Sequence, residues 1–447
     1  MKNILAYTLP VIAGLLISGC AKLEYSPKDS VPSATAINNL ASAKAAVFGV
    51  YSEVQDSDLA FDGWLSNNQY FSDEAAFTGT FPTRLEFSQF NVFPANTTMA
   101  AVFSDFYDVI NEANNVIEAL EAGGFDDVGL TPAVINSFLG EVRFIRAYCY
   151  WYLTNNWGSV PLITTPTREV TDEALQVPNS SRSAILDQIV ADLTFAEANL
   201  TTAGPSRVTA AAATAMLARA YLTAGDYATA LTKATAVINS GAYALESDYA
   251  SGFSNSSSEA IWYLNFTNVD NNSLAFFYFP SGLGGRLSIS PSAKLMSSFD
   301  AADLRFDATI DTSSVPGTPF GIKYSRISNG TDPLYFIRLA EMYLIAAEAA
   351  AEAGDFGAAN GYINTVRTRA GLADVALDAN NYVDLILTEK YKELAFEGGQ
   401  RLWDLRRRGL ATSVLGPLGY EAPIDDLWPF PQRDIDRNTN LVQNAGY

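Results

Sequence analysis

Residues 62–70 (DGWLSNNQY) combine aromatic rings with amide and carboxylate side chains. Flat rings can pack on the C–H faces of sugars, while amide, carboxylate and guanidinium groups can hydrogen-bond to hydroxyls. Glycan recognition requires this combination, so Trp64, Asn67 and Tyr70 are candidates for ligand contacts. The structural alternative is that Trp64 packs against helices while the polar residues only turn the chain.

A second stretch of the same character covers residues 268–286. It combines Asn and Gly residues with an aromatic run, and its candidates for ligand contacts are Tyr278 and Arg286. Trp262 and Tyr263 come shortly before it, in an apolar run that predicts a strand, and we expect them in the core.

Adjacent carboxylates occur at Asp73-Glu74 and at Asp425-Asp426. Glycoside hydrolysis uses two carboxyl groups, one on each side of the scissile bond. Neighbours in sequence rarely reach both sides of a bond, so neither pair predicts catalysis. The chain contains no histidine, which excludes Ser-His and Cys-His catalytic pairs. We therefore expect no catalytic residues, and a secreted hydrolase is a disfavoured alternative.

Metal and nucleic-acid binding are also disfavoured. Without histidine, zinc lacks its commonest nitrogen ligand, and the acidic loop at 270–272 lacks the twelve-residue calcium pattern. We expect no metal and no cofactor. The formal net charge of -21 argues against nucleic acid and anionic lipid surfaces, since little would neutralise their phosphates.

The segment from 397 to 408 carries a dense cluster of charged residues: Glu397, Arg401, Asp404, Arg406, Arg407 and Arg408. The arginines could form an anion site. Ion pairing that fixes a late helix against the rest of the molecule is the favoured interpretation.

Residues 333–372 predict two helices folded back on each other, because apolar residues recur at helical spacing in both halves. Gly354 supplies the left-handed residue that ends the first helix, and Asp355 is a good N-cap for the second. A matching hairpin covers 217–231, with its turn at Gly225-Asp226-Tyr227 in a tetratricopeptide-like pattern. The turns lie much farther apart than the roughly 34-residue period of a tandem array.

The predicted fold is mainly α, with tetratricopeptide-like hairpins forming a scaffold and loop-rich insertions that contain short β-strands. We expect one domain over 33–447, with insertions at about 56–95 and 243–332. Strands are predicted at 260–266 and 275–279, and an extended tail at 423–447. Further helices are predicted at 35–54, 99–122, 132–155, 183–200 and 382–396.

The N-terminus has the features of a secretory signal. Lys2 precedes an apolar run that is too short to span a membrane, and small residues stand directly before Cys20. This is similar to a bacterial lipoprotein signal over 1–19, in which Cys20 is acylated and becomes the first mature residue. Residues 20–32 would then be a tether to the membrane.

The chain resembles the SusD/RagB family of outer-membrane nutrient-binding lipoproteins from Bacteroidetes. The resemblance covers nearly the whole chain, and its most specific piece is EKYKELAFEGGQRLWDLRRR at 389–408. Further matching motifs stand in the family's order at Cys20, 146–162, 338–341, 364–372, 427–431 and 443–447.

The resemblance implies a non-catalytic protein, lipid-anchored in the outer membrane and facing outward. Such a protein would capture an oligosaccharide or another small nutrient and hand it to a SusC-like TonB-dependent transporter. Ligand contacts in the family often come from the N-terminal insertion, which favours Trp64, Asn67 and Tyr70. The alternatives are peptide capture and a tetratricopeptide-like scaffold that binds protein partners.

Overall fold

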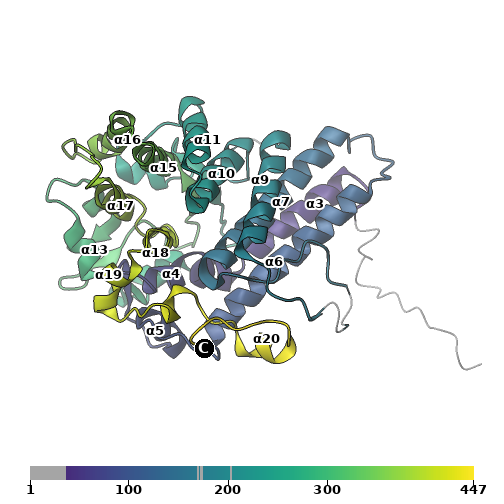
Figure 1. Cartoon of the computed structure of the whole chain (residues 1–447), viewed down its shortest axis with the longest axis horizontal. Helices are drawn as coiled ribbons and strands as arrows, with labels where there is room; N and C mark the ends of the chain where they lie inside the picture. The colour runs from purple at the N-terminus through teal and green to yellow at the C-terminus, as the bar shows by residue number, and fades with distance from the viewer. Residues whose placement is uncertain (1–36, 169–170, 172–174, 202–203) are drawn as a thin grey trace, which may run out of the picture.

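The computed structural model describes residues 37–168, 171, 175–201 and 204–447. Cys20, the signal at 1–19 and the tether at 20–32 lie outside the described residues. Helices dominate the described chain and are arranged as a row of antiparallel pairs (Figure 1). No helix in these ranges is long and apolar enough to cross a membrane.

The N-terminal half of the scaffold consists of four long helices: α3 (Leu40–Val54), α6 (Thr97–Ala122), α7 (Pro132–Trp157) and α9 (Arg182–Asn199). Helix α3 packs on α6 and α7, and α9 packs on the other side of α7. Pro132 stands at the first position of α7, where its missing N–H costs nothing. These helices confirm the periodicity predictions, with bounds that differ by a few residues.

Both predicted hairpins are present, as α10 (Ala210–Ala224) with α11 (Tyr227–Asn239) and α15 (Leu339–Glu352) with α16 (Phe356–Arg369). The first helix of the 333–372 prediction begins too early, because residues 334–338 form a strand that pairs with residues 260–264. Gly225 and Gly354 adopt φ values of 79° and 77° at the two turns. Asp226 and Asp355 accept hydrogen bonds from the backbone of the next helix, as N-caps do. Helix α11 packs against α15, so the two hairpins are neighbours despite the insertion between them.

The insertion at 56–95 is more helical than its composition predicts. It contains the π-helix η1 (Leu59–Ser66), α4 (Asn67–Tyr70), β1 (Ala75–Phe77) and α5 (Pro82–Ser88). The whole of η1 and α4 is buried, which explains how a segment rich in Asn and Gly becomes helical. Packing against the scaffold has overridden weak local propensity.

The insertion at 243–332 contains short strands, as predicted, but also short helices. Its elements are η2 (Tyr249–Phe253), β2 (Ala260–Leu264), α12 (Leu274–Tyr278), η3 (Ser281–Leu283), β3 (Ile289–Pro291), α13 (Ala293–Ser298), α14 (Arg305–Thr309), β4 (Ile310–Asp311) and β5 (Phe320–Gly321). The strand prediction at 260–266 is confirmed by β2, which pairs with β6 (Leu334–Arg338). The strand prediction at 275–279 is wrong, because α12 occupies it. A continuous apolar run has no periodicity that separates a buried strand from a buried helix.

The C-terminal part is helical up to residue 415 and then irregular. Helices α17 (Tyr382–Glu393), α18 (Gln400–Arg407) and α19 (Ala411–Leu415) lead into η4 (Gly416–Leu418), η5 (Ile424–Asp426) and α20 (Gln432–Arg437). The tail predicted to be extended therefore includes helical turns. It runs back along α6 and α7, where Trp157 donates a hydrogen bond to the Pro429 carbonyl at 2.9 Å.

Candidate functional site

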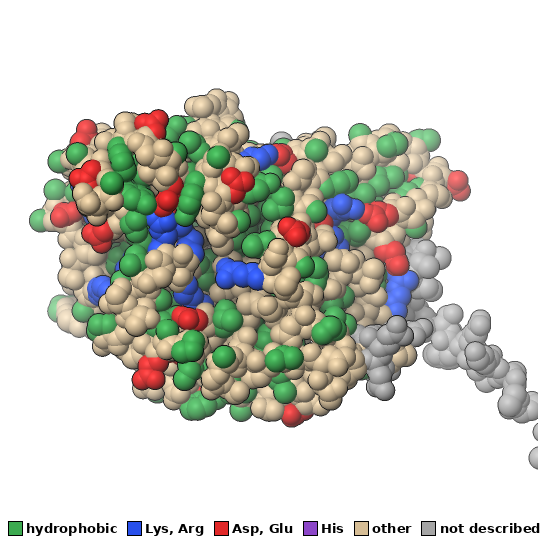
Figure 2. Space-filling model, in the orientation of Figure 1, with side chains coloured by type: hydrophobic (Ala, Val, Ile, Leu, Met, Phe, Trp, Pro, Cys, Tyr) green, Lys and Arg blue, Asp and Glu red, His purple; other side chains and the backbone are tan. Residues whose placement is uncertain are grey.

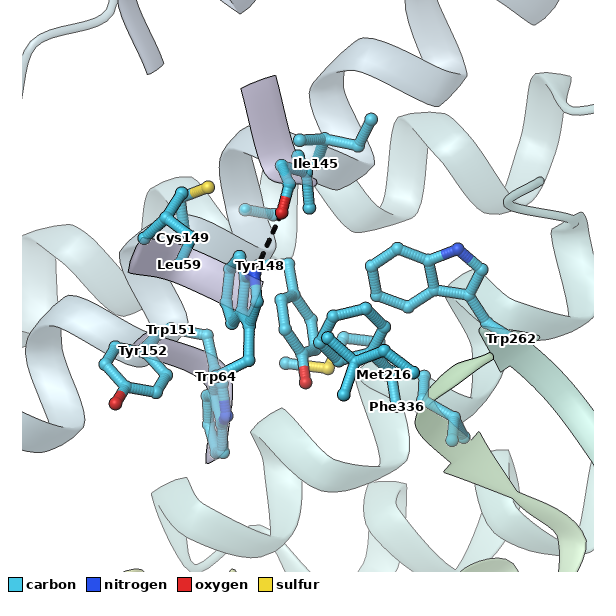
Figure 3. Packing of buried hydrophobic residues seen from close by; sticks show 14 of the residues in the cluster. Leu59, Trp64, Ile145, Tyr148, Cys149, Trp151, Tyr152, Met216, Trp262 and Phe336 are labelled. Atoms are coloured by element: carbon cyan, nitrogen blue, oxygen red, sulfur yellow. Dashed lines mark hydrogen bonds between the residues drawn. The ribbon is translucent and has the colours of Figure 1, made fainter. Parts of the chain in front are cut away.

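Trp64 is a core residue, with only 3% of its surface exposed. Its indole Nε1 donates to the Val54 carbonyl at 3.1 Å, and its ring packs edge-on against Phe106 and Phe336 (Figure 3). The indole therefore offers no face to a ligand. Trp64 packs against helices, which is the structural alternative to ligand contact.

Asn67, Tyr70 and Tyr278 are also buried. The Tyr70 hydroxyl donates to the Ser288 carbonyl at 3.1 Å, and the Tyr278 hydroxyl donates to Gln69 Oε1 at 2.7 Å. Both bonds run between the two insertions. Tyr70 and Tyr278 therefore fasten the insertions together, while the buried Asn67 amide has no hydrogen-bond partner in the described chain. Ligand contact through these side chains gains no support from the structure.

The two insertions form one face, although some 200 positions separate them in sequence. Strand β1 pairs with β3 in antiparallel register, with Ala76 opposite Ser290. The Phe61 ring stacks on Phe277 with centroids 4.2 Å apart. The predicted ligand stretches are therefore adjacent, which their separate positions in the sequence did not indicate.

The described parts of the two insertions expose the rings of Phe81, Phe93 and Phe276, of which Phe81 and Phe276 belong to the segments that meet here. Phe81 precedes α5 and Phe276 lies on α12, and each has 40% of its surface exposed. The Arg286 guanidinium lies 4.4 Å from the Phe81 ring centroid, and that of Arg84 lies 4.9 Å from it. Of the predicted ligand residues within the described chain, Arg286 alone lies beside an exposed ring. We call Phe81, Arg84, Phe276 and Arg286 the aromatic–arginine face.

Gly285 positions Arg286. The Arg286 N–H donates to the Phe276 carbonyl at 2.7 Å, which folds the 276–286 loop back on α12. A Cβ on Gly285 would stand 2.1 Å from the Phe279 carbonyl oxygen, so only glycine permits this close approach. The glycine-rich sequence 282–285 thus places an arginine beside an aromatic ring.

A small pocket of about 240 Å³ adjoins the aromatic–arginine face. Arg84 contacts both oxygens of Asp62, at 2.8 and 2.7 Å, and the Thr83 and Thr98 hydroxyls lie 2.7 Å apart. Burial alone would lower the pKa of Arg84, but the bonds to Asp62 have the opposite effect, and the net pKa lies above its usual value. This guanidinium therefore stays charged. The full lining is Asp58, Asp62, Phe81, Thr83, Arg84, Thr97, Thr98 and Ala101.

This arrangement suits a ligand that has flat apolar faces and many hydroxyl groups. The exposed rings can pack on C–H surfaces, while the arginine, threonine and aspartate side chains donate and accept hydrogen bonds. The exposed residues Phe81 and Phe276 were missed in the sequence, because nothing local distinguishes them from the many buried phenylalanines.

The adjacent carboxylates have structural partners. Asp73 is buried and contacts Arg401 at 2.8 Å and Lys294 at 2.9 Å. Burial raises the pKa of Glu74 to about 8, and its carboxyl accepts a hydrogen bond from the Phe396 N–H. The Asp425 carboxylate accepts from the Glu421 N–H at 2.6 Å. Neither pair presents carboxyl groups on opposite sides of a cleft.

Three carboxylates that are distant in sequence approach one another. Ligand oxygens of Asp56, Asp58 and Asp105 lie within 4.8 Å of each other. Burial and the two neighbouring aspartates raise the pKa of Asp105 to about 7. Calcium takes six to eight oxygen ligands, so this cluster alone does not define a metal site.

The charged cluster at 397–408 forms ion pairs, as favoured. Arg401 pairs with Asp73 at 2.8 Å, Arg407 with Glu348 at 2.6 Å, and Arg408 with Glu352 at 2.5 Å. Glu397 joins a buried network through Arg338 and Lys323, at 2.6 Å each. These pairs fasten α17 and α18 to the hairpins. Arg406 differs from these arginines, because it forms no ion pair with any residue of the described ranges.

Comparison with known proteins assigns the family. Residues 35–222 match the family model described as "Starch-binding associating with outer membrane", and residues 322–447 match the model described as "SusD family". The chain belongs to the SusD family. SusD-like protein P2 of Formosa agariphila is 27% identical, over 98% of each chain.

Solved structures share the fold over nearly the whole chain. A SusD superfamily protein from Bacteroides vulgatus has a TM-score of 0.82 at 21% identity and covers 91% of this chain and 99% of its own. A laminarin binding SusD-like protein has a TM-score of 0.80 at 26% identity, covering 92% of this chain and 100% of its own. The mainly helical, tetratricopeptide-like fold predicted from the sequence is thereby confirmed.

Proposed function

We propose that this chain is a non-catalytic glycan-binding lipoprotein on the outer-membrane surface. It captures an oligosaccharide on the aromatic–arginine face and passes it to a SusC-like TonB-dependent transporter. The observation that carries the proposal is the two exposed rings, Phe81 and Phe276, on joined insertions, with the Arg84 and Arg286 guanidinium groups beside Phe81. The laminarin binding named for one similar structure supports the ligand class.

Binding without catalysis fits the chemistry of this face. Asp62 lies in the adjoining pocket, but its carboxylate is held by both nitrogens of the Arg84 fork. Both oxygens of this carboxylate are therefore occupied by a guanidinium rather than free to approach a glycosidic bond. Burial, Asp56 and Asp62 raise the pKa of Asp58, whose carboxylate oxygens lie within 4.8 Å of those of Asp56 and Asp105. The two carboxyl groups of a glycosidase instead flank the scissile bond, about 5–9.5 Å apart.

Calorimetric titration of the soluble mature chain tests the proposal. The ligand panel contains laminarin, starch, and other plant, host and microbial polysaccharides. We expect at least one glycan to bind, and Phe276→Ala and Phe81→Ala each to weaken that binding about tenfold, since one stacking contact contributes roughly 1–2 kcal/mol.

Phe48→Ala is the matched control. Phe48 is 41% exposed and lies on α3 beneath the Arg207 guanidinium, 5.2 Å from its ring centroid. It therefore reproduces the exposure and the cation contact of Phe81 at a different place. Failure of every glycan to bind would contradict the proposal. Binding of peptides or proteins instead would favour the alternative of a protein-binding scaffold.

The proposal also includes a lipid anchor at Cys20 and a SusC-like transporter as partner. Small residues before Cys20 support acylation at that cysteine, and Cys20→Ser should release the protein from membranes. Fractionation of cells that express each form measures this, and membrane retention of the variant would contradict the anchor. Delivery to a transporter predicts that a SusC-like protein co-purifies with the anchored chain from detergent extracts.

A further inference from the structure

A second cavity, of about 400 Å³, lies on another part of the molecule from the aromatic–arginine face. It is formed where the end of α7, the start of α9, α18, α19 and η5 meet. Its volume falls in the roughly 300–1,000 Å³ range of small-molecule sites. The full lining is Asn155, Arg182, Trp403, Arg406, Arg407, Gly409, Ala411, Thr412, Ala422, Asp426 and Leu427. Figure 2 shows Lys and Arg side chains gathered in a recess of the face that carries α18.

Arg182 and Arg406 in this lining lack carboxylate partners. Neither forms an ion pair with any residue of the described ranges, in contrast to Arg401, Arg407 and Arg408. Arg406 donates to the main-chain oxygens of Asn155 at 3.2 Å and Asp425 at 2.8 Å. Its other contacts are also neutral, a hydrogen bond with Tyr420 and the Phe71 ring, whose centroid lies 5.6 Å from the guanidinium. Its Nε has no hydrogen-bond partner.

Both guanidinium groups are held against the same residue. Arg182 donates to the side-chain oxygen of Asn155 at 3.2 Å, while Arg406 donates to its main-chain oxygen at the same distance. Two like charges are therefore brought close together, with only neutral acceptors between them. Such an arrangement costs free energy that a bound anion would recover.

Nearby acidic groups do not neutralise the pair. Asp426 lines the cavity but accepts the Tyr420 hydroxyl at 2.7 Å, and the Asp425 carboxylate is turned to the Glu421 N–H. Burial lowers the pKa of Arg406 although Tyr420 and both aspartates act to raise it. Partial desolvation and Arg406 likewise lower the pKa of Arg182. In a chain with a net charge of -21, this is a local excess of positive charge.

We propose that this cavity binds a small molecule through an anionic group, either a carboxylate or a sulfate, held between Arg182 and Arg406. Guanidinium forks bind such planar or tetrahedral oxyanions with two parallel hydrogen bonds. Trp403 supplies an apolar wall and Thr412 a hydroxyl for the rest of the ligand. Arg407 contributes little charge, because Glu348 and Asp404 each contact it at 2.6 Å.

Titration with two anionic probes tests the proposal on the full soluble chain. Sodium sulfate and glucuronate are titrated at low ionic strength, with glucose as the neutral control. We expect one or both anions to bind and glucose not to bind in this cavity. Preference for glucuronate identifies a carboxylate ligand, and preference for sulfate identifies a sulfated one.

Substitutions locate the binding. Arg182→Gln, at an exposed position with one hydrogen bond, leaves the fold intact and should weaken anion binding about tenfold. Arg406→Gln should weaken it at least as much. Asp426→Asn should tighten it roughly twofold by removing a repelling charge. Lys44→Gln, which removes one positive charge on α3, is the matched control and should change nothing.

Two results would overturn the proposal. One is the absence of binding by both anions. The other is anion binding that Arg182→Gln leaves unchanged, because that variant does not depend on the stability of α18. Neither result bears on the aromatic–arginine face, whose variants are measured with neutral glycans.

Discussion

Arg338 is one cation of a buried cluster of carboxylates. Its guanidinium is fully buried and contacts Glu259 at 2.7 Å, Glu393 at 3.1 Å and Glu397 at 2.6 Å. Removal of this cation leaves three buried carboxylates with fewer cationic partners, which costs more than the pair contributed. We expect Arg338→Met to lower the free energy of unfolding by about 3–5 kcal/mol, measured by urea denaturation.

Arg433→Met is the control for loss of an arginine. Arg433 is 44% exposed and pairs with the adjacent Asp434 at 3.3 Å. An exposed pair contributes roughly 0–1 kcal/mol, so this variant should remain close to the parent chain. Equal effects of the two substitutions would contradict the account of the buried network.

Glu74 makes stability depend on pH. Burial raises the pKa of its carboxyl from 4.5 to about 8. Between these values the folded state binds the proton while the unfolded state releases it, so stability falls as the pH rises through this window. Glu74→Gln removes this contribution and keeps an acceptor for the Phe396 N–H. We expect the variant to gain stability relative to the parent from pH 5 to pH 8. If the free energies of unfolding of parent and variant changed with pH in parallel, Glu74 would be ionised in the folded state, which contradicts this prediction.

At the residue scale, the sequence indicated which residue types a glycan site needs, but not which of those residues are exposed. Trp64, Tyr70 and Tyr278 satisfy the same compositional rule as Phe81 and Phe276, yet the first three are buried. Exposure depends on contacts with distant segments, such as the bond from Tyr70 to Ser288. Arg286 was predicted because its stretch combines aromatic and polar residues, and its guanidinium lies beside the exposed Phe81 ring.

Among the elements, the Gly-Asp turns give the sharpest test of local structure. Gly354 has a φ of 77°, and a Cβ there would meet no atom within 4 Å. Only backbone strain therefore opposes a side chain. Gly354→Ala should destabilise the fold by about 1 kcal/mol in urea denaturation.

Gly361 lies within α16 and provides a control of opposite sign. A Cβ there also meets no atom within 4 Å, and the backbone is helical. Gly361→Ala should therefore stabilise the protein by roughly 0.5–1 kcal/mol. If both alanines destabilised the protein alike, the left-handed turn would not be the cause at Gly354.

Element predictions succeeded where periodicity is long and failed where it is short. The long helices and both hairpins repeat apolar residues over many turns, which defines a buried face. Residues 275–279 form a continuous apolar run, and α12 could not be distinguished from a strand. Helices η1 and α4 could not be predicted, because burial by the scaffold stabilises them.

At the scale of the whole molecule, two proposed ligand sites lie on different parts of the fold. One is the aromatic–arginine face at the joined insertions, and the other is the basic cavity around α18. The first depends on segments brought together by β1 and β3, the second on the ends of α7, α9 and α18. The order of elements was predictable from sequence, but these junctions depend on tertiary packing of segments far apart in the chain.

Hydrogen–deuterium exchange in the presence of the tightest-binding glycan from the panel tests the central claim most directly. The account predicts slower exchange at 81–84 and 274–286 on binding, since these segments carry Phe81, Arg84, Phe276 and Arg286. At a glycan concentration near the Kd of the parent chain, Phe276→Ala should reduce that protection strongly, whereas Phe48→Ala should preserve it. Protection confined to other segments would contradict the assignment of the glycan site. The segments of α6 and α20 that line a cavity of about 600 Å³ are one such place.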